Sequence, residues 1–410
     1  MSCCEPPLGL AYLRALVSRR HDIGVHPADA LDADAPPRDM YLYRPAEILV
    51  PIDQVELFVI TAKRLGIRVW PLDETSDKHR PTEVARFGVG VNAPLDTVLD
   101  RLVRATGGRL HVTPNHVLLT CPVWGFSPAG EPQVAPGLPT AKDEGAPWAV
   151  TVAVIDSGLP EGFTANELLA AVSAAPDEEE SWEYSGSHPV LTFPQGHGSF
   201  VAGVVRMAAP RAQVRSYMDA DQDGVTDEWY LGQQIELALE DGPAVINLSL
   251  GATTRHDEAL MGLAQLQTAA ASEGGPIVVA AAGNLAGDRP FWPAAEPWAI
   301  GVAAVDLIGD PGVPTPAWFT DYGSWVDVCA VGVDVVSAYE AHPYRPVTDP
   351  TELLHFEGAA IWSGTSFAAP RVAAAVATLL AVDSGVSRDA ALTLFAAAGV
   401  EVPGIGTFVE

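Results

Sequence analysis

Residues 150–158 are Val-Thr-Val-Ala-Val-Ile-Asp-Ser-Gly, an apolar run rich in β-branched residues that ends on a carboxylate. Such a run predicts a buried strand. Because α/β proteins keep their functional sites at the carboxyl edge of the sheet, Asp156 is a candidate site residue. Taken alone, an aspartate at a strand end is more often a turn or cap residue, so this assignment needs support from the rest of the chain.

Beyond residue 150 the chain alternates β-rich apolar runs with segments of helical periodicity. This alternation predicts an α/β fold with a mostly parallel central sheet and helices on both faces. Residues 372–382 are the longest apolar run in this half of the chain, and they are about half as long as a bilayer span requires, so we expect a buried helix there. The expected segments are 150–155, 201–207, 213–217, 232–240, 245–250, 259–272, 277–281, 298–305, 326–330 and 367–380.

Two further blocks carry reactive side chains beside apolar helices. Gly196-His197-Gly198-Ser199 precedes the first helix, and its glycines let another group approach the imidazole. Ser363-Gly-Thr-Ser-Phe-Ala-Ala-Pro370 opens the second helix, whose first-turn N–H groups can bind an oxyanion beside Ser366. Individually, a structural histidine and a helix cap explain these blocks equally well.

Taken together, Asp156, His197 and Ser366 supply an orienting carboxylate, a general base and a nucleophile in the order Asp, His, Ser. With the blocks Val-Ile-Asp-Ser-Gly, His-Gly-Ser-Phe-Val-Ala-Gly and Gly-Thr-Ser-Phe-Ala-Ala-Pro, the sequence resembles the subtilisin-like serine proteases, or subtilases. The resemblance covers about residues 150–384. It implies a subtilisin-like fold and an Asp-His-Ser triad.

The resemblance also implies residues that bind the oxyanion and the substrate. Asn284, at the end of Ile277-Val-Val-Ala-Ala-Ala-Gly-Asn284, matches the oxyanion-hole asparagine, whose contribution in the transition state is roughly 3–4 kcal/mol; a plain Gly-Asn turn is the alternative. Asn247-Leu-Ser-Leu-Gly251 resembles the edge strand that pairs with an extended peptide. The implied substrate-binding residues are Ser249, Leu250 and Gly251 on that strand, and Ala280, Ala281, Ala282 and Gly283 on the opposite pocket wall.

The chain departs from the family pattern in three places, which limits what the resemblance says about specificity. Ser199-Phe200 stand where Thr-His is commoner, and Ala330-Val331-Gly332 stand where Ala-Pro-Gly is usual. Residues 340–358 form a longer insert before the serine block. We expect this insert to shape the leaving-group side of the cleft.

The N-terminal part divides into three segments. Residues 1–40 are an Asp-, Ala- and Pro-rich arm with one short helix expected at 8–18. Residues 41–121 show the periodicities of a βαββαβ unit, which predicts a small α+β ferredoxin-like domain, with Asn92 as the expected cap of its second helix. Residues 122–149, with six prolines and four glycines up to Val150, are expected to be a linker before a peptidase domain at 150–410.

Subtilases commonly carry a ferredoxin-like pro-domain that assists folding and then inhibits the active site. The resemblance therefore implies intramolecular inhibition by residues 41–121, with cleavage in the linker. The alternative is a permanently attached accessory domain that recruits a partner.

The segment Asp219-Ala-Asp-Gln-Asp-Gly-Val-Thr-Asp227 has oxygen ligands at the first, third, fifth and ninth positions of a calcium loop. Position 12, where a bidentate glutamate is needed, is Tyr230. Two interpretations stay open: a structural calcium held by Asp219, Asp221, Asp223 and Asp227, or a solvated acidic turn. The triad chemistry itself requires no cofactor.

Charge narrows the choice of partners. The net charge is −29, of which −3 falls in residues 1–145 and −26 in residues 146–410. A surface this negative repels phosphate backbones and anionic lipids, so we expect no nucleic-acid or membrane partner. Residues 1–20 lack an export signal, which favours a cytoplasmic location, and we expect four free thiols at Cys3, Cys4, Cys121 and Cys329.

The sequence thus predicts a serine endopeptidase that cleaves a protein or peptide substrate through an acyl-enzyme. A dedicated protein substrate is favoured over general degradation, since an unrestrained cytoplasmic protease is toxic. The alternative of a different class is a catalytically silent, partner-binding protein on a subtilase scaffold. The intact set of Asp156, His197, Ser366 and Asn284 argues against that alternative.

Overall fold

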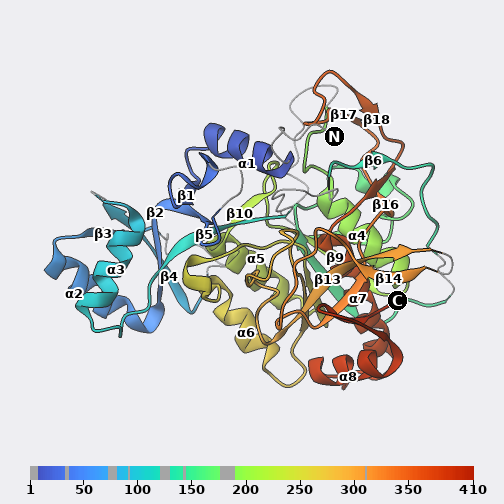
Figure 1. Ribbon diagram of the computed structural model, residues 1–410. Helices are drawn as coiled ribbons and strands as arrows, with labels where there is room; N and C mark the ends of the chain where they lie inside the picture. The colour runs from blue at the N-terminus through green and yellow to red at the C-terminus, as the bar shows by residue number, and fades with distance from the viewer. Residues whose placement is uncertain are drawn as a thin grey trace.

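The computed structural model describes residues 8–32, 37–72, 81–90, 93–120, 130–141, 145–175, 190–309 and 312–410. Two regions lie side by side: a small antiparallel sheet with two helices, and a larger body built from the residues after 145 (Figure 1). Cys329 is a buried free thiol, as predicted, and Cys3, Cys4 and Cys121 lie outside the described residues.

The body is built on one sheet with the strand order β20-β21-β15-β13-β12-β11-β7-β9-β8. All neighbours in this order are parallel except β20 and β21, and β14 adds antiparallel to β13, so the predicted mostly parallel sheet is confirmed. The strands are β7 (Thr151–Asp156), β8 (Val172–Ala174), β9 (Gln213–Met218), β11 (Val245–Leu248), β12 (Ile277–Ala281), β13 (Ala299–Ile308), β14 (Val313–Pro316), β15 (Val328–Val331), β20 (Val400–Val402) and β21 (Gly406–Phe408).

Helices cover both faces of this sheet because the side chains of β7 alternate between them. Val152 and Val154 belong to the apolar cluster that includes α4 and α7, whereas Ala153 and Ile155 belong to the cluster that includes α5 and α6. Although α7 is long and apolar enough to span a membrane, two thirds of it is buried in the first cluster, as expected for a core helix. The helices are α4 (His197–Ala208), α5 (Glu228–Glu240), α6 (Ala264–Ala270) and α7 (Thr365–Val382).

The position of β7 in the sheet explains why its last residue belongs to a site. After β7 the chain builds β8 and β9 on one side of it, and then crosses to β11 on the other side. The connections leave the carboxyl ends of β7 and β11 in opposite directions, and α/β proteins keep their sites at such a point of the sheet. Asp156 ends β7 at this point.

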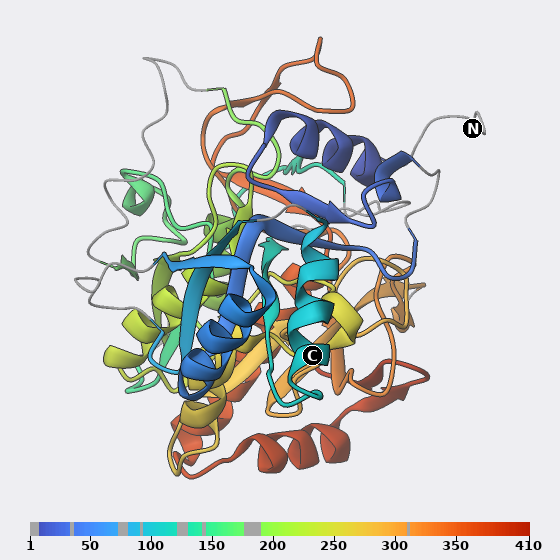
Figure 2. The ribbon, with the colours of Figure 1, turned by 90° about the vertical axis from the view of Figure 1, so that its left-hand side faces the viewer.

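The N-terminal region is an antiparallel sheet with the strand order β5-β2-β4-β3, to which β1 (Gly24–His26) adds at β2. Helices α2 and α3 cover one face of it (Figure 2) and share an apolar cluster with the strands. The elements follow the predicted order, but α3 begins after Pro94, and Asn92, its expected cap, lies outside the described residues. The bounds are β2 (Tyr41–Pro51), α2 (Val55–Leu65), β3 (Arg68–Pro71), β4 (Val84–Gly90), α3 (Leu95–Ala105) and β5 (Thr113–Leu119).

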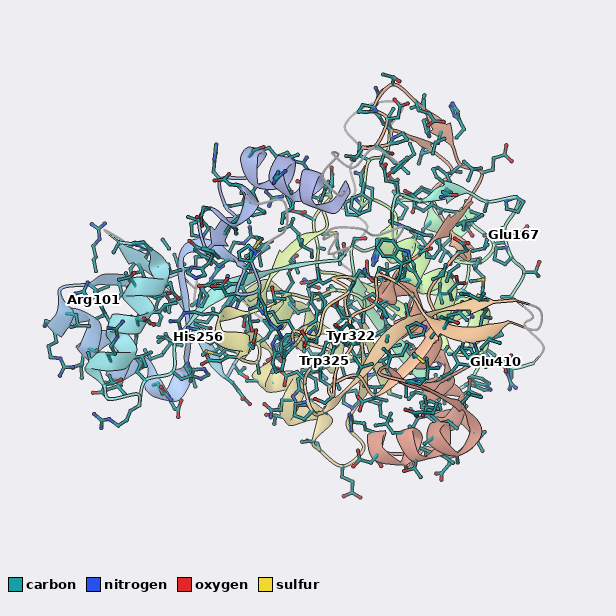
Figure 3. All side chains as sticks on the ribbon, viewed as in Figure 1. Arg101, Glu167, His256, Tyr322, Trp325 and Glu410 are labelled. Carbon is teal, nitrogen blue, oxygen red and sulfur yellow. The ribbon has the colours of Figure 1, made fainter. Side chains whose placement is uncertain are left out.

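The two regions are joined through β5. Strand β10 (Val225–Asp227) of the body pairs antiparallel with it, so the small sheet continues into the body. Beside this pair, the buried His116 ring contacts the buried Glu228 carboxylate through Nδ1 and accepts a hydrogen bond from the Arg255 N–H through Nε2 at 3.0 Å. Figure 3 marks His256, the neighbour of Arg255, at this boundary.

The arm before the sheet packs against the body. Helix α1 (Leu8–Arg19) confirms the predicted short helix, and its Leu13 and Leu16 are buried in the same apolar cluster as α4 and α7. The sequence showed the helix but not its docking, because two leucines one turn apart do not reveal which surface they contact.

We expect Leu16→Ala to lower the free energy of unfolding by about 2–5 kcal/mol, because it leaves a cavity at a fully buried position. Chemical denaturation monitored by tryptophan fluorescence measures the change. Leu394→Ala, the same truncation at a helical position that is 46% exposed, is the matched control and should change stability far less. Equal effects of the two substitutions would contradict the docking of α1.

Candidate active site

The site is centred on a buried carboxylate–imidazole pair. Asp156 Oδ1 lies 2.7 Å from His197 Nδ1, and both side chains are fully buried. The same oxygen accepts a hydrogen bond from the Ser157 N–H at 2.7 Å, which fixes the carboxylate. His197 is the first residue of α4, and Gly198 beside it allows a close approach, since a Cβ there would lie 2.4 Å from the Gly158 carbonyl oxygen. A carboxylate on Nδ1 directs the Nε2 side of the ring toward the reacting groups.

Ser366 lies in the first turn of α7, where the free N–H groups of the helix point outward. Its Oγ is 3.3 Å from the carbonyl oxygens of Thr120 and Ser249, and its own carbonyl accepts a hydrogen bond from Ser249 Oγ at 2.8 Å. The His197 ring is 5.4 Å from the ring of Phe367, the next residue. The structure therefore brings Asp156, His197 and Ser366, which the sequence predicted as a triad, to one site.

Asn284 is oriented by the residue before the serine. Its Oδ1 accepts hydrogen bonds from the N–H and the hydroxyl of Thr365, at 2.9 and 3.0 Å, and Thr365 Oγ1 accepts one from the Gly283 N–H at 3.1 Å. Because both donors of Thr365 go to Oδ1, the amide Nδ2 is the group left to donate elsewhere. Nδ2 lies beside Gly364, 3.7 Å from where a Cβ would stand. The oxyanion-hole role of Asn284 stays a prediction, which requires this free amide donor.

Asp321 holds the loop that follows Asn284, a role that the sequence did not show. It is fully buried, and its Oδ1 accepts hydrogen bonds from the N–H groups of Leu285 and Gly287, each at 2.9 Å. Burial raises the pKa of Asp321 well above its usual range. The sequence marked residues 319–327 only as a family-like block, since nothing along the chain indicates which loop a buried aspartate will bind.

The predicted edge strand already pairs with a peptide strand, which belongs to the chain itself. Leu119 and Gly251 exchange two backbone hydrogen bonds of 3.1 Å, and the Thr120 N–H donates to the Gly224 carbonyl at 3.0 Å. The end of β5 thus runs between Gly251 on one side and Gly224 with β10 on the other, and arrives at Ser366. The family resemblance implied inhibition by residues 41–121 but not the residues that make this contact, because no motif in residues 113–120 specifies the pairing with Gly251.

The other predicted substrate-binding residues lie in the same part of the molecule. Leu250 is buried in the cluster that includes Leu118 of β5. Ala280, Ala281 and Ala282 are buried in and after β12, and Gly283 follows them with a φ of 103°, a conformation that favours glycine. Their role as a pocket wall stays a prediction.

The acidic loop is linked to the arm and to β2 by arginines. Arg20 contacts Asp221 at 2.7 Å and Asp223 at 3.1 Å, Arg19 contacts Asp223, and Arg44 contacts Asp227 at 2.7 Å. Among the described residues, no group of three or more His, Cys, Asp or Glu side chains is gathered to bind a metal. A calcium ion at this loop would therefore have to displace these arginines.

The remaining acid of that loop, Asp219, is buried and accepts a hydrogen bond from Thr226 Oγ1 at 3.0 Å. Burial raises the pKa of Asp219 well above its usual range.

The insert contributes a buried carboxyl group that contacts helix α4, which begins at His197. Ser199, one of the departures from the family pattern, donates a 2.6 Å hydrogen bond to Glu340 at the start of the insert. Burial raises the pKa of Glu340 to about 7. The unusual serine and the insert are therefore one structural feature.

A sequence model of the Subtilase family matches residues 148–394, which is more than half of the chain. The chain belongs to the subtilase family of serine peptidases. Among its curated relatives, thermitase of Thermoactinomyces vulgaris is 29% identical over 253 residues, which are 59% of this chain and 78% of thermitase. The thermophilic serine proteinase of Bacillus sp. strain AK1 is 33% identical over 193 residues, 45% of this chain and 42% of that protein.

Structural comparison extends the likeness beyond the peptidase body. This subtilase is similar to fervidolysin from Fervidobacterium pennivorans, described as a keratinolytic enzyme related to subtilisin, with a TM-score of 0.61 and 20% identity over 90% of this chain and 60% of that one. At this identity the likeness shows the fold alone. The matched parts amount to between two fifths and four fifths of the length of these relatives.

We expect Asn284→Leu to lower kcat about 10²- to 10³-fold with little change in KM, because it removes one oxyanion donor while nearly conserving the volume. Steady-state kinetics on a peptide p-nitroanilide, with the melting temperature as a check on folding, measures this. A kcat within about threefold of wild type would exclude Asn284 from the oxyanion hole.

Glu340 should make stability depend on pH. Its pKa rises from an ordinary 4.5 to about 7 on folding, so the folded carboxyl binds its proton more tightly than the unfolded one. This contribution is fully present below pH 4.5 and is lost as the pH rises to 7, by about 3 kcal/mol in total. Glu340→Gln should flatten the curve of unfolding free energy against pH in this window. Glu352→Gln, at an exposed position of the same insert, should leave the curve unchanged.

Proposed function

We propose that this subtilase is a serine endopeptidase that hydrolyses peptide bonds through an acyl-enzyme intermediate. His197 takes the proton of Ser366 as Oγ attacks the carbonyl carbon, and Asp156 stabilises the imidazolium. The Asn284 amide and the Ser366 N–H stabilise the oxyanion, His197 returns the proton to the leaving amine, and water then hydrolyses the acyl-enzyme. The single observation that carries the proposal is the peptide segment ending at Thr120, which lies extended against Ser366.

That segment indicates how a substrate is bound. The main-chain pairing with Gly251 and with β10 recognises any extended peptide, because it uses no side chain of the substrate. Selectivity is left to side-chain contacts such as those of Leu118, which is fully buried in a cluster with Leu248, Leu250 and Trp292. We propose an apolar preference at this position and a dedicated protein substrate.

We further propose that residues 41–121 inhibit the peptidase by filling its cleft. The βαββαβ element order and the sheet order β5-β2-β4-β3 support a ferredoxin-like unit whose last strand serves as the inhibitory segment. Activation requires a cut that releases this strand. It falls between Thr120, which contacts Ser366, and Gly130, where the chain enters the body.

Self-cleavage tests both parts of this proposal. Purified wild-type chain should convert to a form that begins between Thr120 and Gly130, and this form should react with a fluorophosphonate probe. Ser366→Ala should remain a single intact chain and should not be labelled, because it lacks the nucleophile. Intact-mass spectrometry and gel fluorescence provide the measurements, and Ser384→Ala, at an exposed serine, is the matched control.

Other outcomes point elsewhere. A wild-type chain that stays intact but reacts with the probe supports a permanent accessory domain. A chain that neither cuts itself nor reacts after limited trypsin digestion supports the silent, partner-binding scaffold instead.

A further inference from the structure

The linker contributes a strand to the peptidase body. Residues 122–149 were expected to be an exposed tether, yet β6 (Gln133–Val134) pairs antiparallel with β19 (Ala359–Trp362). The partners are Val134 with Ala360, and Gln133 with Ile361. Strand β19 is followed directly by Ser363-Gly-Thr-Ser366, so β6 lies against the strand that leads into the nucleophile. Pro132, next to β6, is buried.

Glu131 attaches this strand to the insert. Its carboxylate accepts hydrogen bonds from Tyr344 Oη at 2.8 Å, from the Thr348 N–H at 2.9 Å, and from the Val347 N–H and the Thr348 hydroxyl. Tyr344 belongs to the hairpin of β17 (Pro343–Tyr344) and β18 (Leu354–His355), which stands near β6 at the upper right in Figure 1. One linker side chain thus satisfies four donors of the insert.

Gly130 connects the strand to the catalytic base. Its carbonyl accepts a hydrogen bond from the indole Nε1–H of Trp362, which is 2% exposed. The Trp362 ring meets the His197 ring edge-on, with centroids 5.7 Å apart and planes at 85°, and it also packs on Phe367. A buried indole N–H requires an acceptor, so the position of this ring depends on a residue of the linker.

From these contacts we infer that residues 130–134, the linker strand, are a permanent part of the active site, and that Gly130 and Glu131 act through Trp362 and the insert as positioning residues for His197. This inference rests on the proposed function: after the cut between Thr120 and Gly130, β5 departs with the N-terminal region. The linker strand remains, because its covalent connection to the body keeps its effective concentration high. After the cut, β5 therefore leaves the site, whereas the linker strand stays in it.

Two substitutions test this in the mature enzyme. Trp362→Phe keeps an aromatic ring but removes the N–H, and Glu131→Ala removes the attachment to the insert. Trp362→Phe should lower kcat up to about tenfold, the effect of one neutral hydrogen bond, and Glu131→Ala should also lower kcat; both should leave KM within about twofold. Because the surroundings of His197 change, the acid limb of the pH profile of kcat/KM should shift, which a purely structural role would not produce. Glu131→Gln, which keeps one acceptor oxygen, should recover part of kcat.

Two exposed residues of the same types serve as controls. Glu352→Ala changes an exposed glutamate of the insert, and Trp318→Phe changes an indole that is 49% exposed; both should behave as wild type. Hydrogen exchange adds a readout that is independent of turnover: the Val347 and Thr348 amides should exchange faster in Glu131→Ala than in wild type.

Three results would overturn the inference. They are a mature N-terminus beyond Val134, wild-type kcat and pH profile in both variants, and unchanged exchange at the two amides. Failure of the proposed function looks different, since the wild type would then neither cut itself nor react with the fluorophosphonate. In that case the exchange experiment still decides whether the linker strand is attached to the insert.

Discussion

The hydrogen bond between Asp156 and His197 is the interaction around which the rest of the site is arranged. A carboxylate buried at the end of a central strand is costly unless it is paired. His197 provides the partner, and the Ser157 N–H adds a second hydrogen bond to the same oxygen. The imidazole in turn is confined by the aromatic rings of Trp362 and Phe367. Because the pair is buried, water does not compete for its hydrogen bond, and the surrounding protein groups hold both side chains in place.

The second constraint is the open edge at Gly251. An unpaired strand edge attracts another strand, and proteins normally protect such edges. A peptidase must keep this one available, because substrate recognition is strand addition. Here β5 of the N-terminal region covers it and is itself flanked by β10. In the proposed function, protection of the edge and inhibition of the site are the same contact.

The N-terminal region carries most of the basic residues and the body most of the acidic ones, and some of these opposite charges pair where the two regions meet. The segment up to residue 145 carries 15 of the 23 basic residues, and the remainder of the chain carries 34 of the 52 acidic ones. Arg19, Arg20 and Arg44 use part of that basic charge on Asp221, Asp223 and Asp227 of the acidic loop. Complementary charge of this kind favours correct association of the regions more than it adds stability, since exposed ion pairs contribute little.

The sequence by itself determined the α/β fold of the body and the family, and it predicted Asp156, His197, Ser366 and Asn284 as the site residues. Apolar periodicity and short glycine-rich blocks are local features, so they can be recognised without the tertiary structure. The tertiary structure alone decided that Thr120 lies against Ser366, that Glu131 binds the insert, and that Asp321 supports the Asn284 loop. Each of these contacts joins residues far apart in the chain through backbone groups or a single carboxylate. Such pairings depend on strand register and on which distant segments meet in the fold. Neither can be read from the residue types alone.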